Sequence, residues 1–156
     1  MITTISKDNR ILIADVQKRI LNGQQVRMTV RGRSMRPFIE DGRDKVVLEA
    51  CSDYRVGDVV LADTREKGYV IHRLTRIDAA TGQCELRGDG NLDVEHCTLN
   101  DMVAKIVMFY RKANEKPCSV ESRKWKIYSW VWMKLLPVRR YLLAFNWRFR
   151  KYILRQ

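Results

Sequence analysis

Hydrophobic and polar residues follow two different periods along this chain, one typical of helices and one typical of strands. Over residues 8–22 apolar side chains recur at roughly helical spacing, with Asp8 suited to cap a helix and Gly23 to end it. Short β-branched runs bounded by turn residues follow at 26–30, 45–51, 57–63, 68–78, 83–89 and 101–112. The pattern predicts a mainly β fold: a rolled β-sheet or barrel core with an N-terminal helix and a C-terminal helical tail.

The last third of the chain has a different pattern. Residues 122–136 and 138–155 are amphipathic at helical spacing and are interrupted at Pro137, so they predict two helices. We therefore divide the 156 residues into a domain at 1–112 that includes the helix at 8–22, a linker at 113–121 and a tail at 122–156.

Charge supports this division. The net charge of +12 is concentrated at one end, because residues 108–156 hold 13 Lys or Arg against only Glu115 and Glu121. The same segment holds 11 of the 14 aromatic residues. The preceding 107 residues are nearly neutral, so the charge belongs to the tail and its surroundings.

A basic helix with aromatic residues on its apolar face is suited to lie in a membrane interface. We expect the tail to bind an anionic membrane surface through a set of aromatic and basic residues: Trp125, Trp130, Trp132, Arg139, Arg140, Phe145, Trp147 and Phe149. Two alternatives are a helical pair that packs on the domain or on a partner protein, and nucleic-acid binding. Nucleic acid is the less favoured partner, because it would make no use of the regular apolar periodicity.

Targeting signals and cysteines bear on compartment and cofactors. The N-terminus has no secretory signal, and no segment approaches 18 uninterrupted apolar residues. The cysteines Cys51, Cys84, Cys97 and Cys118 are not spaced as metal ligands, so no metal and no cofactor are expected. We expect a cytoplasmic protein, peripheral on the inner face of the membrane, with a soluble cytoplasmic protein as the alternative.

The first candidate for chemistry is the segment Gly32-Arg33-Ser34-Met35-Arg36-Pro37. A serine on a shaped loop directly after a strand is exposed, and backbone N–H groups nearby can hold an oxyanion. The alternative is an ordinary turn serine.

The second candidate is His72, which stands in the predicted strand at 68–78. A strand can hold an imidazole as a general base within reach of a hydroxyl, although a strand histidine can equally be structural. The segment at 88–96 adds the carboxylates of Asp89, Asp93 and Glu95, one of which could orient the imidazole. A plain turn is the alternative for that segment.

Taken together and in this order, the Gly-x-Ser-Met-x-Pro, His-Arg and Gly-Asp-x-Asn segments resemble the signal peptidase family. More broadly they resemble the serine-peptidase clan that signal peptidases share with LexA-type self-cleaving repressors. The resemblance covers about residues 24–110. The resemblance implies the rolled β fold of that clan. The chain differs from typical members because it has an amphipathic helix at 8–22 where they carry a transmembrane anchor.

The resemblance also implies roles for individual residues. Ser34 matches the nucleophile. His72 matches the general base, as in the signal peptidases of the endoplasmic reticulum and archaea, where bacterial enzymes typically use lysine. The third member falls on Glu95, with Asp93 and Asp89 as alternatives. The loop residues around the oxyanion site would be Gly32, Arg33, Met35 and Pro37.

These observations lead to one principal hypothesis and two alternatives. The principal hypothesis is a serine endopeptidase that cleaves a peptide or precursor protein through an acyl-enzyme on Ser34. The alternatives are a catalytically inactive peptide-binding or regulatory module on the same fold, and a nucleic-acid-associated regulator.

Overall fold

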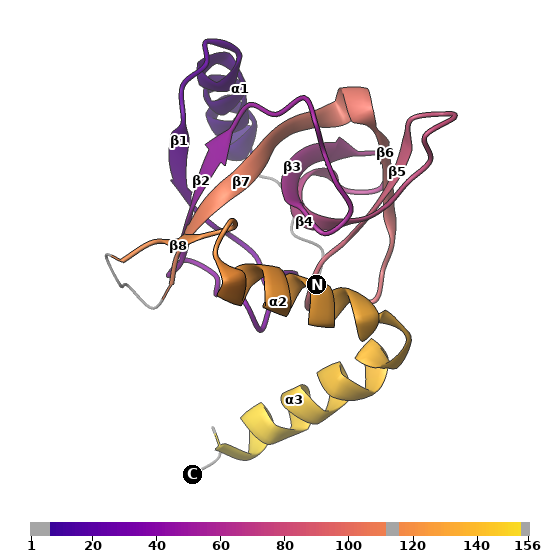
Figure 1. The fold of residues 1–156 in the computed structure, drawn as a ribbon. Coiled ribbons are helices and arrows are strands. Elements are labelled where there is room, and N and C mark those ends of the chain that lie inside the picture. The colour runs from indigo at the N-terminus through magenta and orange to yellow at the C-terminus, as the bar shows by residue number, and fades with distance from the viewer. Residues whose placement is uncertain (1–6, 112–115, 154–156) are drawn as a thin grey trace.

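One curled antiparallel sheet forms the body of the molecule (Figure 1). The computed structural model describes residues 7–111 and 116–153. Seven strands follow the order β1-β2-β7-β3-β4-β5-β6, and an eighth, β8, pairs with β7. Their bounds are β1 Val26–Thr29, β2 Lys45–Glu49, β3 Val59–Thr64, β4 Gly68–Ile77, β5 Gln83–Arg87, β6 Glu95–Thr98, β7 Met102–Tyr110 and β8 Cys118–Ser119. The prediction of a mainly β fold with a rolled sheet is confirmed.

The curl of the sheet brings its last strand back toward the turn between β3 and β4. The backbone N–H of Arg65 in that turn donates to the carbonyl of His96 in β6 at 3.1 Å. Glu66 of the same turn accepts from the His96 backbone N–H at 2.9 Å. Two parts of the chain that are thirty residues apart therefore meet, and Glu95 is carried toward the middle of β4.

Two strands were not predicted. No strand was predicted between residues 89 and 101, yet β6 begins at Glu95 and pairs with β5 through Cys84 and Cys97. The linker expected at 113–121 differs as well. Residues 113–115 lie outside the described residues, but β8 pairs with β7 through Met108 and Ser119, so the sheet continues into this segment.

The predicted N-terminal helix is present as α1, Lys7–Leu21. Ile13, Val16 and Ile20 are buried in the core, whereas Ile11 and Leu21 are exposed. The buried residues are three and four positions apart, so they form one helical face. Gly23 ends the helix with a φ of 72°, a conformation that residues other than glycine rarely adopt.

The tail forms α2 (Arg123–Lys134), the short 3-10 turn η2 (Leu136–Val138) and α3 (Arg139–Ile153). Ser122 caps α2 by accepting from the backbone N–H of Trp125 at 3.2 Å. Pro137 lies in η2, at the predicted interruption. Figure 1 shows α2 lying along the sheet and α3 extending from its end. Among the described residues no helix combines the length and apolar character needed to cross a bilayer.

Part of the residue set assigned to a membrane surface faces the domain instead. Trp125 is only 5% exposed and belongs to the main core. Its ring lies 4.6 Å from that of Phe38 and 4.5 Å from that of Phe109. Trp132 stacks on Tyr128, and Arg139 is buried. The assignment of Trp125 and Arg139 to a membrane surface is therefore corrected, because these side chains fix the tail to the domain.

The remaining members of that set are distributed differently. Trp130, Arg140 and Phe145 are exposed. The side chains of Trp147 and Phe149 lie outside the described residues. The tail thus has one side committed to the domain and another side exposed.

This arrangement predicts opposite outcomes for two neighbouring tryptophans of α2. Trp125→Ala should lower the free energy of unfolding by about 3 to 5 kcal/mol, because it opens a cavity in the main core. Trp130→Ala, at a position that is 63% exposed, should change it by less than about 0.5 kcal/mol. Urea unfolding followed by far-UV circular dichroism measures both. Equal effects of the two substitutions would contradict the packing of α2 on the sheet.

Candidate active site

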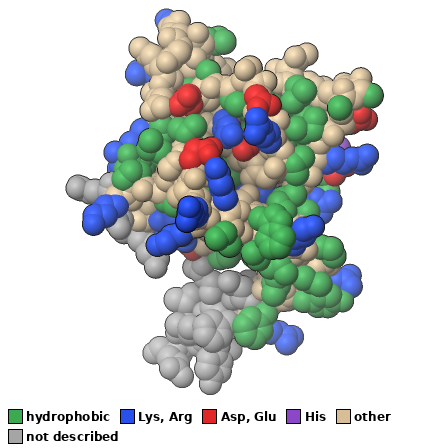
Figure 2. All heavy atoms as spheres, in the orientation of Figure 1, with side chains coloured by type: hydrophobic (Ala, Val, Ile, Leu, Met, Phe, Trp, Pro, Cys, Tyr) green, Lys and Arg blue, Asp and Glu red, His purple; other side chains and the backbone are tan. Residues whose placement is uncertain are grey.

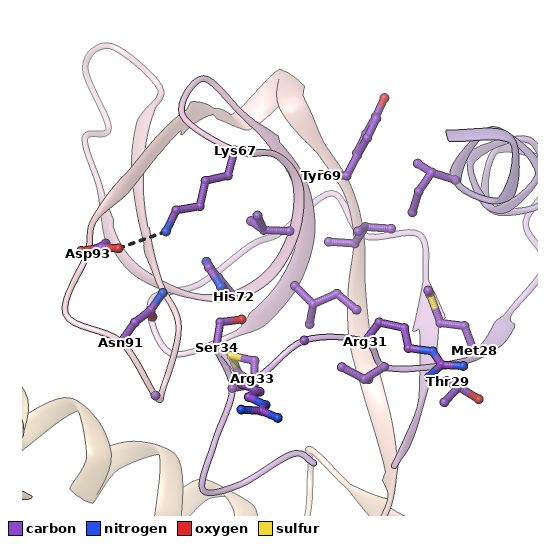
Figure 3. A pocket seen from close by; sticks show the side chains of 18 of the residues that line it. Met28, Thr29, Arg31, Arg33, Ser34, Lys67, Tyr69, His72, Asn91 and Asp93 are labelled. Atoms are coloured by element: carbon purple, nitrogen blue, oxygen red, sulfur yellow. Dashed lines mark hydrogen bonds and ion pairs between the residues drawn. The ribbon is translucent and has the colours of Figure 1, made fainter. Parts of the chain in front are cut away.

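A groove of about 390 Å³ lies between α1, the segment after β1 and the first half of β4 (Figure 3). Ser34 and His72 both line it. Apolar side chains make up much of the remaining wall, among them Leu12, Met28, Val30, Leu61 and Ile71. A concave, mostly apolar cavity with a few converging polar groups is the usual form of a binding site.

The loop that carries Ser34 is held from both sides of that residue. Gly32 has a φ of 100° and turns the chain away from β1, and its N–H donates to Asp41 at 3.1 Å. Beyond Ser34, the side chain of Met35 is buried in the main core. Ser34 itself is half-buried, between the exposed Arg33 and the buried Met35, so its hydroxyl stays at the surface of a fixed loop.

Backbone donors are also available in this loop. No hydrogen bond of the described residues uses the backbone N–H of Ser34. In contrast, the N–H of Arg36 donates to the carbonyl of Arg33, and that of Phe38 to the carbonyl of Met35. Pro37 has no N–H to offer, and the peptide bond before it is cis. Of the expected loop residues, Gly32 and Met35 shape the loop, while Arg33 lines the groove.

His72 is buried in the middle of β4, and one of its ring nitrogens is held by a carboxylate. Nδ1 of His72 lies 2.5 Å from Oε2 of Glu95. The other oxygen of Glu95 accepts from Nζ of Lys67 at 2.6 Å. Because an ionised carboxylate only accepts hydrogen bonds, Nδ1 carries a proton, and in the neutral imidazole Nε2 is then the acceptor. The contact therefore fixes both the ring orientation and the tautomer that a general base requires.

The three carboxylates left open by the sequence have different surroundings. Glu95 contacts His72. The side chain of Asp93 is 70% exposed and pairs with Lys67 at 3.2 Å. Asp89 is fully buried and pairs with Arg73. Of the three, only Glu95 is in position to orient the imidazole.

Ser34 and His72 approach each other across the loop that follows β5. The backbone N–H of Gly90 donates to the carbonyl of Ser34 at 2.6 Å. A Cβ at Gly88 would clash with that carbonyl oxygen and would lie 3.0 Å from Nε2 of His72. Only glycine leaves room for this approach. Figure 3 shows the Ser34 side chain beside the His72 ring, with no hydrogen bond joining the two side chains in the described part of the chain.

A buried ion pair also holds the loop that carries Gly88, Asp89 and Gly90. Arg73 donates from Nε and from a terminal nitrogen to the two oxygens of Asp89, at 2.8 and 2.7 Å. Its other terminal nitrogen donates to Ser129 of α2 at 2.7 Å. Arg139 of α3 adds contacts to Asp89 at 3.4 Å and to the carbonyl of Gly88 at 3.3 Å. The tail therefore supports the loop that lies against Ser34.

Sequence reasoning missed three of these participants. Lys67 lies in a tight turn, where a lysine carries no signal of its own. Arg73 was noted only as the residue after His72. Arg139 was placed on a lipid-facing surface, because helical spacing alone does not show which side of a helix is buried.

The electrostatics of the site favour an ionised Glu95. Burial acts to raise the pKa of its carboxyl group, but the hydrogen bond from His72 and the contact with Lys67 outweigh burial and lower the pKa below its usual value. The hydrogen bond to Glu95, together with the one to Asp93, outweighs burial and raises the pKa of Lys67. A carboxylate, an imidazole and a hydroxyl in sequence are the components of a general-base-assisted nucleophile.

Among the described residues, no group of three or more His, Cys, Asp or Glu could hold a metal ion. No family model matches the chain, and no curated protein or solved structure matches it. The chemistry of this site is therefore inferred from its geometry and from the resemblance of its sequence segments.

The lowered pKa of Glu95 predicts how this contact depends on pH. Because the folded-state pKa lies below the unfolded-state pKa, the carboxylate stabilises the fold above its ordinary pKa of 4.5, and this contribution is lost as pH falls through the lowered value. Glu95→Gln should therefore be less stable than the wild type at pH 7, with a difference that shrinks below pH 4.5. Urea unfolding at a series of pH values measures this.

Asp93→Asn is the matched control, because Asp93 is an exposed partner of the same lysine and should contribute little to stability. A stability difference for Glu95→Gln that does not change with pH would contradict the assignment of an ionised, hydrogen-bonded Glu95.

Proposed function

We propose that this chain is a serine peptidase, a hydrolase of the signal peptidase-like type, with Ser34 as nucleophile and His72 as general base. The observation that carries the proposal is the arrangement around the buried imidazole. Its Nδ1 is held by Glu95 at 2.5 Å, while its Nε2 lies close to Gly88, in the loop that contacts the Ser34 carbonyl. Sequence segments and geometry thus point independently to the same two residues.

The proposed reaction begins when Ser34 Oγ attacks a peptide carbonyl while Nε2 of His72 takes the hydroxyl proton. Glu95 stabilises the imidazolium that forms. The oxyanion is held by backbone N–H groups of the 32–36 loop, and the N–H of Ser34 is available for this purpose. The imidazolium then protonates the leaving amine, and the acyl-enzyme on Ser34 is hydrolysed by water that the same imidazole activates.

The open strand edges next to the groove favour an extended substrate. β1 lies at the end of the strand order and, among the strands that the structure describes, pairs with β2 alone. On β4, pairing with β5 involves Arg73 to Ile77, so residues 68–72 pair with no strand on that side within residues 7–111 and 116–153. An extended peptide can add to such edges through main-chain hydrogen bonds, while its alternate side chains enter pockets. The apolar wall favours a peptide or precursor protein with apolar residues near the cleaved bond.

Covalent labelling tests the nucleophile directly. A fluorophosphonate probe should phosphonylate one serine with loss of fluoride, and peptide mass spectrometry should locate the adduct on Ser34. Ser34→Ala should abolish labelling, whereas Ser52→Ala should not, because Ser52 is an exposed serine outside the groove. If the folded chain binds peptides but Ser34 is never labelled, the site is a peptide-binding module and the proposed reaction is wrong.

The roles of His72 and Glu95 predict a ranking of labelling rates. His72→Ala removes the proton acceptor and should slow labelling by about 10² to 10⁴-fold. Glu95→Gln keeps a hydrogen-bonding partner for the ring, so its effect should be smaller. Asp93→Asn should leave the rate nearly unchanged. Stopped time courses of labelling at pH 7 measure all three, and a larger loss in Asp93→Asn than in Glu95→Gln would refute the role given to Glu95.

A further inference from the structure

The tail has a second side that the domain does not cover. On α2 the apolar residues Ile127, Trp130 and Val131 are exposed, and from the end of η2 into α3 the exposed apolar residues are Val138, Tyr141, Leu142 and Phe145. In both helices their spacing is three and four, so each set forms a single stripe. We call these seven residues the exposed stripe. Figure 2 shows hydrophobic side chains gathered over the region of α2 and the start of α3, with Lys and Arg around them.

The exposed stripe is not needed to hold the tail in place. Trp125 and Tyr128 pack against Phe38 on the opposite side of α2. Ser129 bonds Arg73 and the carbonyl of Gly57 from that same side. An apolar surface of this kind, rimmed by charge, generally marks an interaction site.

The charge around the stripe identifies the kind of partner. Arg123, Lys124, Lys134, Arg140 and Arg148 are exposed on these two helices, and residues 108–156 hold only two acidic side chains. Some of the cations lie directly beside the aromatic rings. The Lys134 ammonium lies 6.0 Å from the Trp130 ring, and the Arg140 guanidinium 4.6 Å from the Tyr141 ring.

A second copy of the chain does not fit this surface well. A symmetric dimer would bring the same patch of both copies together, and with it two sets of like charges. A nucleic acid would satisfy the cations but would leave the aliphatic part of the stripe without an apolar partner. An anionic lipid surface meets both requirements, since aromatic and aliphatic side chains enter the interface while Lys and Arg contact the headgroups.

We propose that the exposed stripe docks the protein on an anionic membrane surface, with α2 and α3 lying in the plane of the interface. Trp130 and Tyr141 enter the lipid, and the flanking cations contact the headgroups. This set of residues differs from the one that helical spacing alone suggested, because Trp125 and Arg139 are excluded from it. The proposal does not depend on peptidase activity.

Vesicle flotation of the full chain tests the docking surface. The protein should float with vesicles of phosphatidylcholine mixed with phosphatidylglycerol, and much less with vesicles of phosphatidylcholine alone. Added salt should weaken the binding, because exposed charges are screened. Trp130→Ser combined with Tyr141→Ser should reduce the partition coefficient on anionic vesicles roughly tenfold or more, since two aromatic side chains no longer enter the interface.

The matched control replaces two exposed apolar residues outside the tail, Leu21→Ser with Leu92→Ser, and should bind like the wild type. Equal unfolding midpoints for the two double variants show that both still fold. Ser34→Ala should also float like the wild type, so a failed labelling experiment and a failed docking experiment can be told apart.

Several results would overturn the proposal. One is the absence of flotation, and another is equal flotation with neutral and anionic vesicles. A third is a loss of binding as large in the control variant as in the stripe variant. Sedimentation equilibrium that shows a dimer dissolved by the stripe substitutions, or tight stripe-dependent binding of a single-stranded oligonucleotide without vesicle binding, would assign the surface to a different partner.

Discussion

The buried ion pair between Arg73 and Asp89 connects the parts of this molecule that form the candidate active site. Both side chains are fully buried, and two hydrogen bonds at 2.8 and 2.7 Å join them. The other terminal nitrogen of Arg73 donates to the carbonyl of Gly57 and to Ser129. Burial of such a pair is tolerated only when its hydrogen bonds are completed, and removal of one partner typically costs about 3 to 5 kcal/mol. β4, the Gly88–Gly90 loop and α2 are therefore held in one arrangement.

Alternation along β4 explains how one strand serves both this anchor and the candidate chemistry. Successive side chains of a strand point to opposite faces, so His72 and Arg73 are directed to different sides of the sheet. His72 meets Glu95 from β6, whereas Arg73 lies 5.0 Å from the ring of Trp125 in α2. The loop with Asp89 bridges the two sides, because Gly90 bonds the carbonyl of Ser34. The position of Ser34 relative to His72 thus depends on the contacts of Arg73 and Asp89, two residues that do not line the groove.

Local patterns in the sequence predicted most strands and α1, because β-branched runs and turn glycines are local signals. They did not predict β6, whose Glu95 and His96 are polar and whose pairing depends on the curl of the whole sheet. For the same reason the sequence could not decide which of Asp89, Asp93 and Glu95 orients His72. All three are close in sequence, and only the fold gives them different surroundings. On α2, Trp125 and Tyr128 show the same helical spacing as Ile127 and Trp130, so periodicity alone cannot decide which pair is buried.

Charge divides the chain differently from packing. The basic segment begins near residue 108, but its first helix shares the core of the neutral domain through Trp125. α3 is attached less firmly, since Arg139 contacts Gly88 and Asp89 at 3.3 and 3.4 Å, longer than the bonds of Arg73. Burial lowers the pKa of Arg139, and the neighbouring cation Arg73 lowers it further, while Asp89 acts to raise it. Arg73 and Arg139 thus share one carboxylate. Asp89 therefore makes shorter hydrogen bonds to Arg73 of β4 than to Arg139 of α3, so the loop beside Ser34 is held mainly by β4.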